Sequence, residues 1–190
     1  MADRFLSSTR QATLFISPDS EPKIGSSIVC SFEGTRPILA EVQALVSRSN
    51  YGIPHRTVSG FDPKKLALIL AILEKHCGLN FSVLDVFIKI AGGLRIDDPG
   101  IDLGISAAIY SSLVNEPLEP NSVYIGEIGL NGEIQNVSQI KRRLDESVKL
   151  GIKNIYLPFL GNHELKYSEK TKPVLLKNIS QLFNNKKSNL

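Results

Sequence analysis

Cysteine is scarce in this sequence of 190 residues. It has two, Cys30 and Cys77, which do not form a Cys-x-x-Cys pair and have no histidine at metal-ligand spacing. The sequence therefore predicts neither a zinc site nor a disulfide framework, and it favours a reducing compartment. Long apolar runs are also lacking, because no stretch approaches the roughly 18 residues that span a bilayer, and the N-terminus has no signal-peptide pattern. We expect a soluble, cytoplasmic protein with no membrane partner.

The motifs that hold nucleotide phosphates are missing too. There is no Gly-x-x-x-x-Gly-Lys-[Ser/Thr] loop, and Gly92-Gly93 lacks the remainder of a Gly-x-Gly-x-x-Gly motif. The sequence thus predicts no ATP hydrolysis and no cofactor for this chain. His55, His76 and His163 fall on different predicted elements, so no metal site is predicted. The 22 Lys and Arg residues barely exceed the 19 Asp and Glu residues, and a net charge of +3 does not by itself indicate a nucleic-acid module.

What the chain does have is the make-up of an ordinary folded domain, with 42% hydrophobic and 22% charged residues. Strands are predicted at about 28–32, 37–46, 81–91, 123–127, 133–137, 154–158 and 174–176, and a further short one at 13–16. Helices are predicted at about 63–77, 101–114, 140–150 and 179–183, and 47–60 is predicted to be an exposed irregular loop. This order indicates an α+β domain with a mixed sheet over 28–160, preceded by a linker at 1–27 and extended by a terminal segment at 161–190.

Two segments carry sharper local signals. Gly104, Ser106 and the alanines at 107–108 make one side of the second long helix small, so another element is expected to pack closely against it. Asn131-Gly132, between two β-rich runs, is the strongest short hairpin signal in the chain.

Several sequence blocks occur in one order and together resemble the C-terminal Lon-protease-like domain of the bacterial RadA (Sms) family, over about residues 32–158. The blocks are Gly34-Thr35-Arg36-Pro37 with the segment 41–46, the segment 70–75, Asp85-Val86-Phe87 before Gly92-Gly93, and the segment 126–133. The resemblance implies a Lon proteolytic-domain-like fold of two layers, a role in DNA recombination and repair within a branch-migration helicase, and a homo-hexameric ring. It also implies contact with single-stranded or branched DNA, and recombinase and replication proteins as partners. ATP, Mg and Zn are implied only for the ATPase core and zinc finger, which this sequence lacks.

Lon-type peptidases, the wider superfamily, activate a serine at the start of one helix with a lysine from the next. The resemblance places Asp102 at the serine position and Lys141 at the lysine position. An aspartate facing Lys141 would keep that lysine protonated, whereas a catalytic base needs a depressed pKa. We therefore predict no peptidase activity. Ser106, one helical turn beyond Asp102, stays open as a displaced nucleophile, although a small residue that permits close packing is the simpler interpretation.

Basic residues in exposed segments are the candidates for DNA contact. The first group surrounds the predicted loop, with Tyr51 available to stack, and comprises Arg48, His55, Arg56, Lys64 and Lys65. The second group comprises Lys141, Arg142 and Arg143. Solvated surface charge is the simpler interpretation for each. The resemblance favours the first group, because the family's Lon-like domain helps the ring to hold DNA.

A further family motif, Lys-Asn-Arg-Phe-Gly, matches this chain only at Arg4-Phe5. The sequence thus favours a non-proteolytic domain that acts as a ring-assembly scaffold and an auxiliary DNA-binding surface. Two alternatives stay open: a divergent serine peptidase that uses Ser106 and Lys141, and an assembly module without DNA contact.

Overall fold

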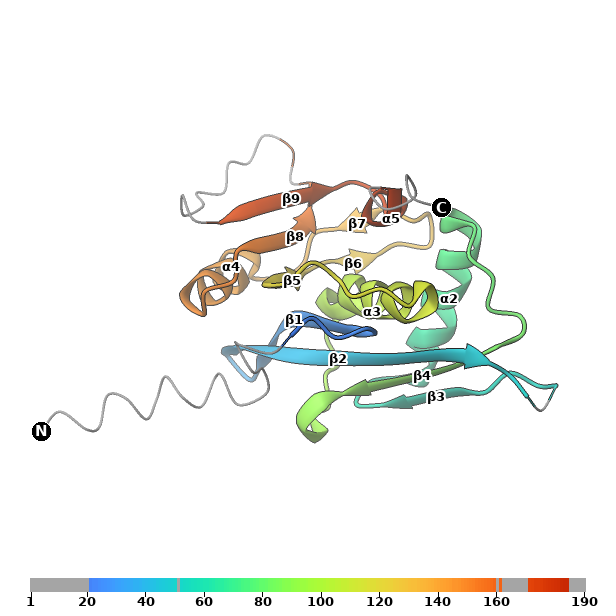
Figure 1. The fold of residues 1–190 in the computed structure, drawn as a ribbon. Coiled ribbons are helices and arrows are strands. Elements are labelled where there is room, and N and C mark those ends of the chain that lie inside the picture. The colour runs from blue at the N-terminus through green and yellow to red at the C-terminus, as the bar shows by residue number, and fades with distance from the viewer. Residues whose placement is uncertain (1–20, 51, 160, 162–170, 185–190) are drawn as a thin grey trace, which may run out of the picture.

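A seven-stranded mixed sheet forms the centre of the computed structural model, which describes residues 21–50, 52–159, 161 and 171–184 (Figure 1). Its strands are β1 (Ser26–Glu33), β2 (Arg36–Arg48), β3 (Arg56–Ser59), β4 (Leu84–Ile90), β5 (Ser122–Tyr124), β8 (Asn154–Pro158) and β9 (Lys172–Leu176). They lie in the order β3-β4-β2-β1-β5-β8-β9. The pairs β1–β2 and β2–β4 are antiparallel, and the other four are parallel. The predicted mixed sheet is confirmed, although parallel pairs predominate and make the class α/β.

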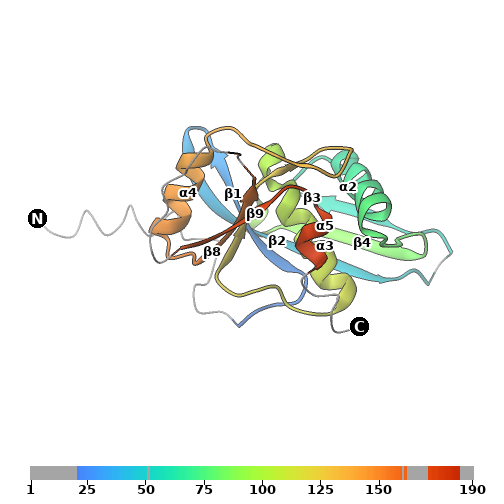
Figure 2. The same ribbon diagram turned by 90° about the horizontal axis from the view of Figure 1, so that it is seen from above.

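Helices cover both faces of this sheet (Figure 2). They are α2 (Pro63–Cys77), α3 (Asp102–Val114), α4 (Ile140–Lys149) and α5 (Ser180–Asn184), with short 3₁₀ turns at Ala91–Gly93 and Pro99–Ile101. Each face of the sheet has its own hydrophobic core, and neighbouring residues of β1 point into different ones. Val29 packs with α2, α3 and α5, whereas Cys30 packs on the other face with Leu144 of α4. The helices therefore make three layers with the sheet, which corrects the expected two.

The ends of α2 are set by its sequence. The Asp62 carboxylate accepts a hydrogen bond from the Lys64 amide at 2.9 Å, and Pro63 opens the first turn. Gly78 ends the helix in the left-handed conformation at φ 69°, which glycine adopts without steric cost. The predicted helix at 63–77 is confirmed at both ends.

Helix α3 packs closely against strand β1, as its small residues predicted. A Cβ atom on Gly104 would lie 2.1 Å from Val29 Cγ1, and the Ser27 hydroxyl donates to the Gly104 carbonyl at 2.7 Å. Gly104 therefore sets the distance between the helix and the sheet.

The predicted elements differ from the structure at two places. The segment 47–60 contains β3, which pairs with β4, and is not irregular throughout. The hairpin at Asn131-Gly132 joins β6 (Glu127–Ile128) to β7 (Ile134–Gln135) in a separate small sheet, while β5 belongs to the main one. The predicted strand at 13–16 lies outside the described residues. Among the helices that the structure describes, none has the length and apolarity needed to cross a membrane.

Candidate functional site

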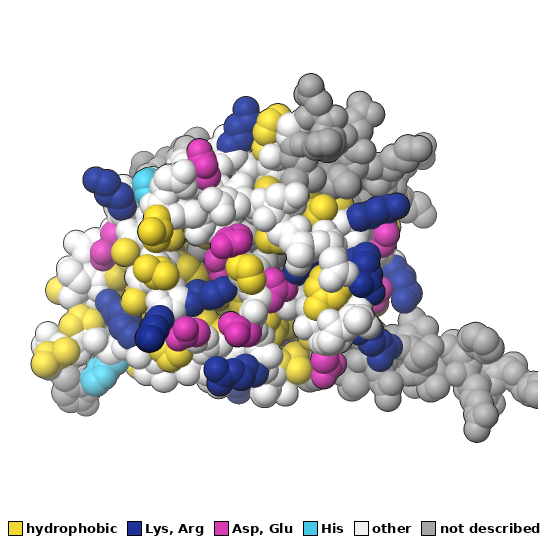
Figure 3. Space-filling model, turned by 180° about the vertical axis from the view of Figure 1, so that it is seen from behind, with side chains coloured by type: hydrophobic (Ala, Val, Ile, Leu, Met, Phe, Trp, Pro, Cys, Tyr) yellow, Lys and Arg dark blue, Asp and Glu magenta, His cyan; other side chains and the backbone are white. Residues whose placement is uncertain are grey.

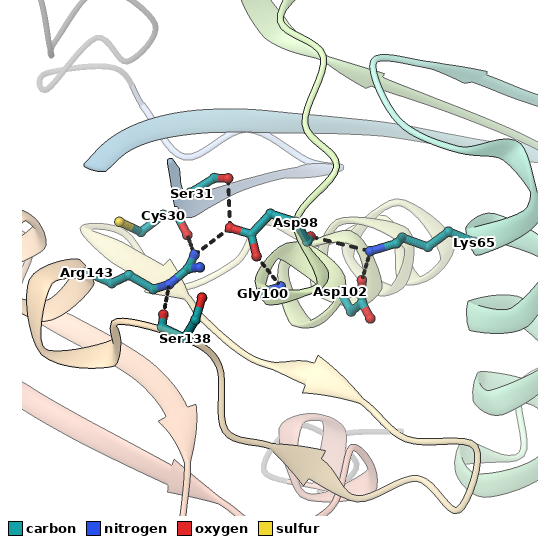
Figure 4. Close-up of polar contacts among 8 residues, drawn as sticks. All are labelled: Cys30, Ser31, Lys65, Asp98, Gly100, Asp102, Ser138 and Arg143. Carbon is teal, nitrogen blue, oxygen red and sulfur yellow. Dashed lines mark hydrogen bonds and ion pairs between the residues drawn. The ribbon is translucent and has the colours of Figure 1, made fainter. Parts of the chain in front are cut away.

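Two ion pairs lie near one another where β1 and β5 end beside the start of α3 (Figure 4). This polar cluster consists of Lys65, Asp98, Asp102 and Arg143. The backbone holds the place together, because the Gly126 amide after β5 donates to the Gly100 carbonyl at 3.0 Å and the Leu103 amide donates to the Gly126 carbonyl at 3.1 Å. In open sheets, ligand sites gather at the carboxyl ends of parallel strands, so this cluster occupies the expected position.

Arg143 is the buried cation of the cluster, with 1% of its surface exposed. Its guanidinium lies 2.8 Å from Asp98 Oδ2, donates through Nε to the Ser138 carbonyl at 3.0 Å and donates to the Cys30 carbonyl. It also lies 4.8 Å from the centre of the Phe32 ring. Arg143 thereby connects α4 with β1 and with the segment before α3.

The two carboxylates of the cluster have opposite electrostatic environments. Burial opposes the ionisation of Asp98, but hydrogen bonds from Arg143 and Gly100 outweigh it and hold its pKa below the usual value. Burial dominates at Asp102 and raises its pKa to about 6, although Lys65 counteracts the rise. Asp98 is therefore held firmly as an anion, whereas Asp102 titrates close to neutrality.

Lys65 of α2 is the partner of Asp102. Its ammonium lies 2.8 Å from Asp102 Oδ1 and 3.4 Å from the Asp98 carbonyl oxygen, while the Ile128 amide donates to Asp102 Oδ2 at 3.5 Å. The expected pairing of Asp102 with Lys141 is wrong, because Lys141 is exposed on α4 and makes no ion pair with any described residue. A lysine from the preceding helix has taken that place.

The alternative dyad of Ser106 and Lys141 is not assembled either. Ser106 is fully buried in α3, and its hydroxyl has no hydrogen-bond partner among the described residues. A nucleophile must reach substrate and a base, and this hydroxyl contacts neither the exposed Lys141 nor the surface.

The five DNA-contact candidates of the first group do not share one environment. Arg48 is exposed at the end of β2, Lys64 is exposed on the first turn of α2, and His55 is exposed just before β3. The Arg56 guanidinium is occupied by backbone carbonyls, including that of Phe81 at 2.7 Å, and Lys65 by Asp102. Three of the five side chains therefore remain open to a ligand.

In the second group, Lys141 and Arg142 are exposed but Arg143 is buried, which corrects its expected place on the surface. Arg4-Phe5, Tyr51 and His163 lie outside the described residues. Within the described ranges no three His, Cys, Asp or Glu side chains are grouped as a metal would require.

The raised pKa of Asp102 predicts a pH dependence of stability. Between pH 4 and pH 6 the folded chain keeps this proton while the unfolded chain loses it, so ionisation of Asp102 lowers the free energy of unfolding as pH rises. A pKa shift from 3.8 to about 6 corresponds to about 3 kcal/mol. Urea unfolding from pH 4 to 7 should show wild type losing about that much relative to Asp102→Asn.

Asp97→Asn is the matched control for this measurement, because Asp97 is exposed. Its stability curve should run parallel to that of wild type. The buried environment inferred for Asp102 would be contradicted if the Asp102→Asn curve were parallel as well.

Comparison with known proteins identifies the relatives of this fold. A family model described as ChlI, subunit ChlI of Mg-chelatase, matches residues 42–160. The chain belongs to the ChlI family. This ChlI-type domain is also 46% identical over 145 residues to the DNA repair protein RadA of Streptococcus pneumoniae, and 44% identical to those of Bacillus subtilis and Halalkalibacterium halodurans. The relationship to RadA that the sequence blocks indicated is confirmed.

The ChlI-type domain is shorter than these relatives. Each match covers 76% of this chain, but only 32% to 34% of the relative. The chain therefore spans about a third of the RadA proteins it matches.

Proposed function

We propose that this chain is a non-proteolytic domain of a RadA-type DNA repair protein, where it helps assemble a ring and adds a DNA-binding surface. The observation that carries the proposal is 43–46% identity to curated DNA repair proteins over 76% of the chain. A role in DNA repair follows from those relatives. The scaffold and DNA-binding functions are specific proposals for this domain, which we place in the cytoplasm.

The proposed lack of peptidase activity is supported by the polar cluster. The nucleophile position holds Asp102, whose carboxylate is in an ion pair with Lys65 at 2.8 Å and offers no hydroxyl to a substrate. Ser106 is the nearest serine along α3, and it is completely buried. A serine-reactive phosphonate should therefore leave the chain unlabelled.

The proposed partners are further copies of the chain, single-stranded or branched DNA, and recombinase and replication proteins. ATP, Mg and Zn are assigned by the same proposal to parts of the relatives that this chain does not span. A hexamer in light scattering would support the ring, and a monomer would assign ring assembly to those other parts.

DNA binding is tested most directly at Arg48. Loss of one phosphate contact should weaken binding to every DNA sequence and reduce the slope of log K against log salt by about 1. We therefore expect Arg48→Ala to show this loss in fluorescence anisotropy with a single-stranded oligonucleotide over a salt series.

Arg36→Ala is the matched control, because Arg36 is an exposed arginine at the opposite end of the same strand, β2. It should bind DNA as wild type does. Equal losses in both variants would refute the assignment of Arg48. A wild-type chain that binds no DNA at any salt concentration would instead favour the assembly module without DNA contact.

A further inference from the structure

No helix among the described residues covers one part of a face of the main sheet. Cys30, Leu39, Val123 and Ile125 lie on the face that packs with α4. Along β2 the same face continues from Leu39 to residues that are open to solvent, because side chains alternate along a strand. The residues of this open face are Gln43, Leu45 and Ser47 of β2, Phe87 and Lys89 of β4, and Thr57 and Ser59 of β3. In both ribbon views β3, β4 and the end of β2 that pairs with β4 lie away from α4 (Figures 1 and 2).

Strand register arranges the open face in rows. Leu45, Phe87 and Thr57 lie side by side across the three strands. Leu45 is 58% exposed and the Phe87 side chain is half-buried. The row therefore presents part of the Phe87 ring to solvent, with the Leu45 side chain on one side and the Thr57 methyl group on the other. The next row places Gln43, Lys89 and Ser59 side by side, all exposed. An apolar row thus adjoins a row with one cation and two uncharged hydrogen-bonding groups.

The carboxylates next to the open face are already bonded. Asp85 Oδ1 accepts the His55 amide at 2.8 Å, and Asp85 is only 8% exposed. At the other border, Glu41 accepts the Ser26 hydroxyl at 2.6 Å. Lys89 is the exposed cation of the open face, whereas Arg48 and Arg56 alternate onto the other face of the sheet.

The opposite side of the molecule gives a useful contrast. Figure 3 shows basic and acidic side chains mixed across the face that includes α2. Leu68 of α2 is 53% exposed there, which is close to the exposure of Leu45. An exposed leucine alone therefore does not distinguish the open face from the α2 face. The half-buried aromatic ring of Phe87 at its centre does.

We propose that the open face binds single-stranded DNA, with a base stacked on Phe87 and a phosphate held by Lys89. This inference rests on the proposed DNA-binding function and names the surface and the form of DNA. Bases stack on aromatic rings whatever their sequence, and such a stack is available only when the base is not paired within a duplex. A second copy of the chain would gain less here, because contact between two such faces would take the Lys89 ammonium out of water.

The chain contains no tryptophan, so a single substitution supplies a site-specific fluorescent probe. In Phe87→Trp, stacking of a base on the indole should quench its emission when a dT oligonucleotide is titrated. Leu68→Trp, on α2, is the matched control and should keep its emission. In Phe87→Leu, loss of one stacked base should weaken single-strand affinity about 5- to 150-fold and leave the salt slope unchanged.

The possible outcomes separate this inference from the proposed function. If the Phe87→Trp variant binds the oligonucleotide but its indole emission stays constant, DNA binds elsewhere and the open-face assignment is overturned. If emission changes with protein concentration alone, the face is covered by a second copy, which also overturns it. If the Phe87 variants fail to fold, Leu45→Ser decides the question without altering the core, and undiminished single-strand affinity would count against the inference. No binding by wild type would refute the proposed function itself.

Discussion

Arg143→Ala should lower the free energy of unfolding by about 3–5 kcal/mol, the cost of removing one partner from a buried ion pair. The substitution leaves the Asp98 carboxylate without its cation. It also removes the donors to the Cys30 and Ser138 carbonyls. Urea unfolding at neutral pH, followed by far-UV circular dichroism, measures the loss.

Arg142→Ala is the matched control for this prediction. Arg142 is the neighbouring arginine on the same helix and also lies over Phe32, at 5.3 Å, but it is exposed. Its removal should cost less than about 1 kcal/mol. The double variant Arg143→Met/Asp98→Asn should recover part of the stability, because it leaves no buried charge unpaired. A loss at Arg143 no larger than the loss at Arg142 would contradict the structural role of the buried pair.

Gly104→Ala should destabilise the chain by about 1–3 kcal/mol even though alanine is the better helix former. The added methyl group would lie 2.1 Å from Val29 Cγ1. Val29 is completely buried, so its neighbours leave it no room to shift. Val29→Ala alone should also destabilise, because it leaves a cavity. In the double variant the new methyl group occupies that cavity, so the two losses should not add. Thermal and urea unfolding of wild type, the two single variants and the double variant make up this double-mutant cycle.

Leu39→Ala provides the control for this cycle. Leu39 is equally buried, but it packs on the α4 side of the sheet and does not contact the new methyl group. Its loss should therefore add to that of Gly104→Ala. If the losses in unfolding free energy also added for Gly104→Ala with Val29→Ala, α3 could move away from β1 at Gly104 without cost. That result would contradict the close packing described above.

Local signals predicted most of the elements correctly, and the errors have a common physical origin. Helix α2 could be predicted because Asp62, Pro63 and Gly78 act within one turn of it. Strand β3 could not, because its four residues follow a segment with Gly52 and Pro54 and become a strand by pairing with β4. That pairing belongs to tertiary structure, and no local pattern encodes it.

The candidate site was predictable in position but not in pairing. Sequence blocks placed Asp102 at the start of α3, where it lies. Lys65 and its neighbour Lys64 differ by only a rotation of about 100° around the helix, so composition could not determine which one turns inward. For Arg143 a signal was present: it follows Ile140 by three positions and precedes Ser147 by four, on the buried stripe of α4.

Arg143 also determines how the chain can come apart. Its hydrogen bond to Cys30 spans 113 positions of sequence, and its ion pair reaches the segment just before α3. Detaching α4 would leave the Asp98 carboxylate without its cation and the Cys30 carbonyl without the Arg143 donor, so we expect partial opening of this helix to cost more than the loss of its apolar contacts alone. We therefore expect α4 and α3, on the two faces of the sheet, to unfold together as one cooperative unit.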